Sequence, residues 1–257
     1  MARLGRGAAF PPRIVRATPA VRIIGDHLAS SGDDSNLTTY TTASITPLAN
    51  RLILAWVVNT KATTPDLPTL TGNDLTWVQV ATTTFNVIAV PTSRVTLFRA
   101  MGSSPTAGAV SIDFAGVTQT SCAWSITTFN NVDTSGTNGS GAIAQSATNN
   151  VDTDTSLTVT LAAFERASNA TAGGFGTSLA ANITVGSGYA ALGNGQTTLP
   201  PSEIGTEWRN DNDTSVDASF GVGNAGGIAV ELRIVGSAPA AAITNAPNAL
   251  MMLGLGI

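Results

Sequence analysis

Five carboxylates lie close together in one polar segment and form the most site-like cluster of the sequence: Glu203, Glu207, Asp211, Asp213 and Asp217. The segment PSEIGTEWRNDNDTSVD is rich in turn-forming residues, which predicts a loop. Asp211 and Asp213 could supply oxygen ligands to calcium, a hard cation that prefers carboxylates and carbonyls. The spacing departs from an EF-hand loop, because no glycine stands at the sixth position from Asp211 and no glutamate at the twelfth. A calcium site therefore stays open, but an ordinary Asp/Asn turn is the simpler interpretation, and we expect no metal.

Other reactive side chains give no catalytic constellation. A glycosidase needs two carboxylates that flank a sugar groove, and the sequence does not place the acidic cluster in that way. Cys122 is the single cysteine and His27 the single histidine, and they lie too far apart in the sequence to indicate an activated thiol. The glycine-rich run GTNGSG lacks the Lys-Ser/Thr ending of a phosphate loop. We therefore expect no catalytic residue, no cofactor and no enzymatic activity.

Four tryptophans could stack on sugars or pack in a core: Trp56, Trp77, Trp124 and Trp208. The first three lie beside apolar residues in strand-like segments, which favours a core role. Trp208 lies between Glu207 and Arg209 in the acidic segment, and we expect this one to face solvent. It is the basis for an alternative function, a carbohydrate-binding module.

The first 25 residues have the character of a basic, extended arm. Five of the 12 basic residues precede the first acidic residue, Asp26, so this segment carries +5 and the remainder of the chain, with all 16 acidic residues, carries −9. Pro11, Pro12 and Pro19 disfavour a helix. Apolar side chains between the arginines fit a protein surface better than nucleic acid. The residues predicted to bind a partner are Arg3, Arg6, Phe10, Arg13, Ile14, Arg16, Arg22 and Ile23.

The composition favours an all-β body. Thr, Ser, Ala, Gly and Asn dominate, and only 11% of the residues are charged. The single lysine, Lys61, leaves few of the edge lysines that prevent sheets from pairing with other chains, so either partners cover the edges or the surface simply contains little lysine. One cysteine excludes an internal disulfide. No apolar run reaches the roughly 20 residues of a membrane helix, so we expect no membrane contact.

Alternation of apolar and polar residues predicts nine or ten short strands. We expect a hairpin of 110–114 with 122–126, a central strand buried on both faces over 51–58, and a second hairpin of 216–222 with 228–234. Residues 130–156 should form a loop with at most a short strand at 142–146. After it we expect a half-buried strand at 157–161, a short helical turn at 162–167, a strand at 183–185 and a Gly/Asn-rich loop up to Pro201. The predicted fold is an antiparallel β-sandwich, a jelly roll or an Ig-like Greek key. The expected organisation is an arm (1–25), a body (26–236) and an apolar tail (237–257).

Three stretches resemble β-rich structural proteins of tailed bacteriophages: GSSPTAGAVSIDFAGVTQTSCAWSITTFNNVDTSGTNGSGAIAQSATN, TSLTVTLAAF and GGIAVELRI. The opening MARLGR, followed by prolines, is also similar to the N-termini of phage virion proteins. The resemblance implies a non-enzymatic virion component that decorates or cements a capsid. Its expected partners are the major capsid protein or other virion subunits, as a homo-oligomer on the particle, without nucleic acid. The alternative is a carbohydrate- or receptor-binding module of a phage fibre or tail.

Overall fold

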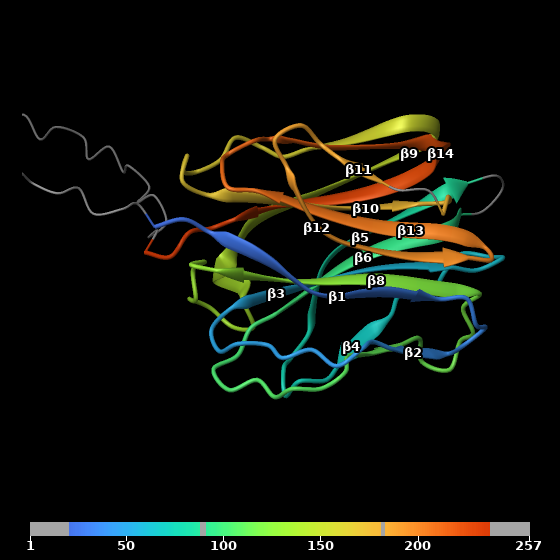
Figure 1. Cartoon of the computed structure of the whole chain (residues 1–257), viewed down its shortest axis with the longest axis horizontal. Helices are drawn as coiled ribbons and strands as arrows, with labels where there is room; N and C mark the ends of the chain where they lie inside the picture. Colours follow the sequence, from blue (N-terminus) through green and yellow to red (C-terminus); the bar gives the residue numbers. More distant parts are fainter. Residues whose placement is uncertain (1–20, 88–90, 181–182, 237–257) are drawn as a thin grey trace, which may run out of the picture.

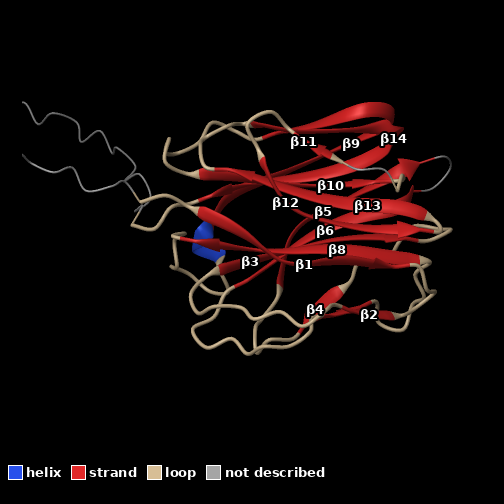
Figure 2. Ribbon diagram, in the orientation of Figure 1, coloured by secondary structure: helices blue, strands red, loops and turns tan. Residues whose placement is uncertain are grey.

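The computed structural model describes residues 21–87, 91–180 and 183–236, and in these ranges the chain consists of antiparallel strands and one short 3-10 helix, η1 (Ser140–Ala142) (Figures 1 and 2). A five-stranded sheet has the order β1 (Ile24–Asp33), β8 (Ser121–Asn130), β3 (Leu52–Thr60), β6 (Pro91–Ala100) and β5 (Val78–Val87). A six-stranded sheet has the order β11 (Thr184–Val185), β14 (Ser215–Leu232), β10 (Ala170–Thr177), β13 (Pro201–Arg209) and β12 (Ala190–Thr198), with β9 (Ile143–Thr160) paired to β14. A small sheet contains β2 (Thr39–Thr41), β7 (Ser111–Asp113) and β4 (Thr69–Thr71). The predicted antiparallel β-sandwich is confirmed.

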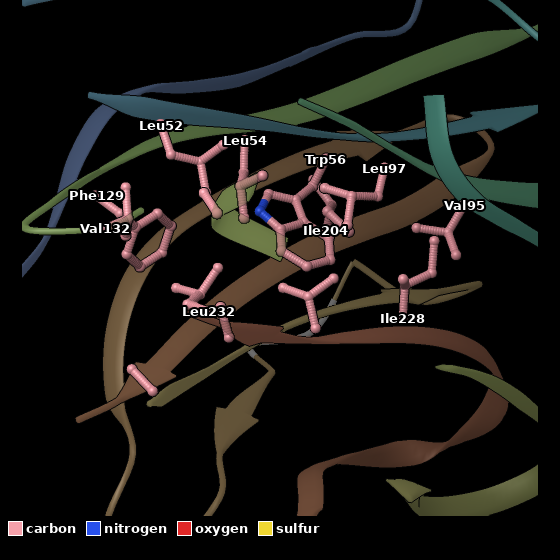
Figure 3. Packing of buried hydrophobic residues seen from close by; sticks show 14 of the residues in the cluster. Leu52, Leu54, Trp56, Val95, Leu97, Phe129, Val132, Ile204, Ile228 and Leu232 are labelled. Carbon is pink, nitrogen blue, oxygen red and sulfur yellow. The ribbon is translucent and has the colours of Figure 1, made fainter. Parts of the chain in front are cut away.

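The central strand β3 separates two hydrophobic cores. All nine of its residues are buried, as predicted for the apolar run 51–58. Leu54 and Trp56 pack into the core between the two large sheets, where Figure 3 shows them pointing toward Ile204. Alternate residues of the same strand, such as Val57, join a second core under the small sheet. Each large apolar side chain buried in this way stabilises the fold by about 1.5–3 kcal/mol.

Glycines in β10 make room for the largest side chain of the opposite sheet. A Cβ on Gly174 would lie 2.2 Å from Cε3 of Trp56, closer than atoms can approach. All eight residues of β10 are buried. The helical turn predicted at 162–167 is absent, and the small, glycine-rich segment that follows it is a core strand. The Gly/Asn-rich loop predicted before Pro201 is wrong as well, because these residues form β12.

The two longest strands, β9 and β14, form one bent ribbon. They pair antiparallel over their length, with register irregularities between Ser219 and Ala225. One half of the ribbon folds over the outer face of the six-stranded sheet, and Val159, Val216 and Phe175 meet there in a third core. The predicted hairpin of 216–222 with 228–234 is wrong, because the glycines between them bend one continuous strand. The polar segment 143–160, predicted to be mostly loop, is the partner strand.

The edge strands of the two large sheets pack against each other on both sides of the sandwich. The edge strands β1 and β12 run against one another so closely that a Cβ on Gly195 would lie 2.4 Å from the backbone oxygens of Ser31 and Trp124. A Cβ on Gly32 would lie 2.1 Å from the backbone oxygen of Gln196. On the other side β5 packs against β9. These edges are covered within the chain, so the low lysine content requires no partner there.

The predicted hairpin of 110–114 with 122–126 is also wrong. Both segments are strands, but β7 pairs with β2 and β4, whereas β8 pairs with β1 and β3. The turn at Ala115 and Gly116 therefore connects two sheets. The body begins before the expected boundary, because Ile23 is buried and β1 starts at Ile24.

Candidate functional sites

The acidic cluster is divided among different structural roles. Glu203 and Glu207 do not lie in a loop; they are buried on the outer face of β13. Oε1 of Glu203 accepts hydrogen bonds from the side-chain amide of Asn194 and from the backbone N–H of Ile183, the latter at 2.9 Å. Oε2 of Glu207 accepts one from the backbone N–H of Gly186 at 2.8 Å. The two carboxylates therefore fasten the segment that carries β11 onto the sheet.

In the described part of the chain, the carboxyl group of Glu207 is buried with only one of its two oxygens hydrogen-bonded. Only 1% of its surface is exposed, and among the described residues its Oε1 has no hydrogen-bond partner. Burial, with a smaller contribution from Asp217 and Asp213, raises the pKa of this carboxyl to about 8, although the N–H of Gly186 opposes the shift. Glu207 is therefore protonated at neutral pH. Burial also raises the pKa of the neighbouring Tyr189 hydroxyl.

Asp211 and Asp213 are held by one arginine. Nε of Arg209 lies 2.5 Å from Oδ2 of Asp211, and its Nη1 lies 2.8 Å from Oδ2 of Asp213. The backbone N–H of Ser215 also donates to Asp213, as expected for an Asp turn. In the described ranges no group of three or more His, Cys, Asp or Glu side chains is arranged to hold a metal ion.

Trp208 does not face solvent freely, which corrects the prediction for this residue. It lies on β13, is half-buried and packs against the central core. Its ring meets Phe129 edge-on at 6.3 Å, and a Cβ on Gly25 would lie 3.0 Å from it. Trp56 and Trp124 are core residues, as predicted, and Trp77 packs against the second core. The carbohydrate-binding alternative therefore loses its original basis.

Cys122 and His27 do not form a reactive pair, because one is buried and the other is exposed. Cys122 is a free, fully buried thiol whose pKa burial raises well above its ordinary value. His27 is exposed, and its Nε2 lies 3.1 Å from the hydroxyl of Ser30. The small apolar role predicted for Cys122 is confirmed.

The described chain begins and ends at the same place, around Asn131. The side-chain amide of Asn131 donates to the backbone oxygen of Arg22 at 2.7 Å, and its own backbone oxygen accepts from the N–H of Val235 at 2.8 Å. Figure 1 shows the two ends side by side at the left of the molecule. Ile23 and Ile234 are both buried in the central core just inside these points. Both ends of the described chain are thus fixed to the body.

Of the residues predicted to bind a partner, the structure places two. Arg22 is exposed at the root of the arm, whereas Ile23 is buried in the chain's own core and is not available to a partner. Val21, Ile24 and Val235 are exposed apolar residues near the same root, at 55%, 47% and 45%. The remaining predicted residues lie outside the described ranges: Arg3, Arg6, Phe10, Arg13, Ile14 and Arg16. The apolar tail 237–257 lies outside them too.

An open cleft of about 830 Å³ lies at the other end of the body. Strand β1 runs from one end of the body to the other. Its first residue, Ile24, pairs with Asn130, which precedes Asn131. Its last residue, Asp33, precedes Asp34 in the cleft wall. Sequence reasoning did not identify this cleft. Its residues come from segments far apart in the chain and share no local motif.

No helix in the described ranges combines the length and apolar character needed to cross a membrane. Comparisons with protein-family models, with curated proteins and with solved structures gave no match.

Proposed function

We propose that this chain is a non-enzymatic structural protein of a phage virion that decorates or cements the capsid, to which its N-terminal arm attaches it. The observation that carries the proposal is the position of the chain ends. Because the described chain begins and ends beside Asn131, we expect the segments that precede and follow it to contact the same neighbouring surface. The rest of the body then faces away from that surface.

The chemistry near this end supports a protein partner. The arm brings arginines for carboxylates of the partner, where charge-assisted hydrogen bonds are strong. Val21, Ile24 and Val235 offer exposed apolar surface at the arm's root, of the kind found in interface cores. The expected partners are the major capsid protein or other virion subunits, and identical copies would gather around symmetry axes of the shell.

Removal of residues 1–20 tests the proposal. This deletion stops short of Ile23 and β1, so the body should keep its circular dichroism spectrum and melting temperature. It should no longer co-sediment with capsids that lack the protein. The matched control is Lys61→Ala, which removes a positive charge at the cleft end of the body, away from the arm. Undiminished sedimentation of the arm-deleted protein would sink the proposal.

The alternative, a carbohydrate- or receptor-binding module of a fibre or tail, needs a site other than Trp208. The cleft at the opposite end of the body is the feature that favours it.

A further inference from the structure

The cleft is assembled from the ends of strands in both large sheets. Its wall includes residues that follow β1 and β3, a residue just after β10, and the turn between β12 and β13. Its volume of about 830 Å³ falls within the roughly 300–1,000 Å³ of typical small-ligand clefts. It lies one strand length from the chain ends, about 30 Å for the ten residues of β1. A ligand there would lie away from the end of the body at which the described chain begins and ends.

The walls of the cleft are fixed by hydrogen bonds. The Asp34 carboxylate accepts from the backbone N–H of Thr198 at 2.9 Å and from its hydroxyl at 2.6 Å, which ties the end of β1 to the β12–β13 turn. Below them the buried hydroxyls of Thr60 and Ser121 are 2.7 Å apart. Nζ of Lys61 is held at 2.7 Å from Oδ2 of Asp66. Asp34, Thr198 and Lys61 are therefore already ordered, and binding would cost little further side-chain entropy at these three residues.

The lining combines polar groups of balanced charge with an apolar rim. Asp34 and Lys61 contribute one charge of each sign, and Asn36 and Ser178 add an amide and a hydroxyl. The rim carries Leu199, which is 77% exposed and is the most exposed large apolar side chain of the described residues. Pro200 and Pro201 follow it and offer ring faces but no backbone N–H.

We propose that this cleft binds a neutral oligosaccharide, with the carboxylate, amide and hydroxyl groups contacting sugar hydroxyls and the Leu199 to Pro201 rim covering the C–H face of a sugar ring. An anionic polymer such as nucleic acid would need a surplus of positive charge, whereas the cleft has one acidic and one basic residue. Extended peptides commonly pair with a sheet edge, whereas this cleft lies across strand ends. The inference gives the alternative function its site and does not depend on capsid attachment.

Binding is tested with the purified full-length protein on an array of bacterial-surface and host glycans. Hits are confirmed by saturation-transfer NMR with the corresponding free oligosaccharides at millimolar concentration. The two cleft variants are Asp34→Asn, which keeps the shape but removes the charge, and Leu199→Ala. The matched control is Leu48→Ala, because Leu48 is 51% exposed and does not line the cleft.

We expect at least about five-fold weaker saccharide binding for each cleft variant, which corresponds to about 1 kcal/mol, and unchanged binding for Leu48→Ala. Melting temperatures identify any variant that is misfolded, and Leu199→Ala keeps the test decisive because so exposed a side chain contributes little to folding. Three results overturn the inference: no binding to any glycan, full binding by both cleft variants, or binding of proline-rich peptides in place of glycans. Each can occur whether or not the arm binds capsids, so failure here is distinguishable from failure of the proposed function.

Discussion

Replacement of Glu207 by glutamine should flatten the pH dependence of stability. The ordinary pKa of a glutamate is 4.5, and in the folded protein that of Glu207 is about 8. Between these values the folded chain retains a proton that the unfolded chain loses. The free energy of unfolding therefore falls by about 1.4 kcal/mol for each pH unit of increase. The stabilisation is fully present below pH 4.5 and is lost once the pH has passed about 8.

From pH 5 to pH 8 this single group should lower the stability of the natural protein by about 4 kcal/mol, an upper limit because the site can relax once charged. Glutamine matches the shape of the protonated acid, and its side-chain oxygen can still accept from the N–H of Gly186. The variant should lack this loss. Urea unfolding, followed by tryptophan fluorescence at each pH unit, measures the difference between the two slopes.

The control is Glu165→Gln, which removes a carboxylate that is 44% exposed and paired with Arg233 on the surface. An exposed pair contributes little, so the control should follow the natural protein within about 1 kcal/mol. Equal slopes for Glu207→Gln and the natural protein would refute the reasoning. The carboxyl would then be ionised in the fold, and its burial would cost far less than the structure implies.

Three further predictions concern packing and buried polar groups. Gly195→Ala should destabilise the protein by at least about 1–3 kcal/mol in chemical unfolding, because its Cβ would meet backbone oxygens at 2.4 Å, whereas Gly108→Ala, with its nearest atom at 3.8 Å, should be close to neutral. The Cys122 thiol should not react with a thiol reagent in the native protein, but it should react after the protein is unfolded in denaturant. Rapid labelling of Cys122 in the native protein would contradict its burial. Gln119→Leu should lower the free energy of unfolding by about 1–3 kcal/mol, because it removes the acceptor of the 2.8 Å hydrogen bond from the buried side-chain amide of Asn59. An unchanged urea midpoint would show that this buried hydrogen bond is dispensable.

The sequence predicts the strands of the central core best. Apolar runs such as 51–58 and alternating segments such as 122–126 carry their burial in their own composition, so both the strand and its buried face follow from the pattern. The fold class follows in the same way. Trp56 and Cys122 are core residues for the same local reason.

Strands composed of small or polar residues could not be predicted in this way. Gly174 is in a strand because β10 pairs with β13 and β14, and it lacks a side chain because Trp56 of the other sheet fills the space beside it. Both relationships join residues far apart in the chain. The Thr- and Asn-rich β9 is a strand because β14 pairs with it over its length. The polar groups of Glu203 and Glu207 look like a loop site in the sequence, but their partners are backbone N–H groups of a segment that a linear pattern does not place nearby.

The sequence indicates which segments are strands better than it indicates which strands pair with one another. A short turn between two alternating segments usually makes a hairpin. The turn at Gly116 instead sends the chain from the small sheet to the large one. The cleft depends on such long-range placement: Asp34 meets Thr198 although 164 residues separate them.

The adjacent ends of the described chain, beside Asn131, also make this body suitable for insertion into another protein. A domain whose first and last residues adjoin can be inserted into a surface loop of a host without pulling the host's own strands apart. The same adjacency allows the ends to be joined by a short linker and new ends to be opened in an exposed turn elsewhere. In either arrangement the Leu199 end of the sandwich would point outward from its support, with the closed sides of the sheets giving foreign strands no edge on which to pair.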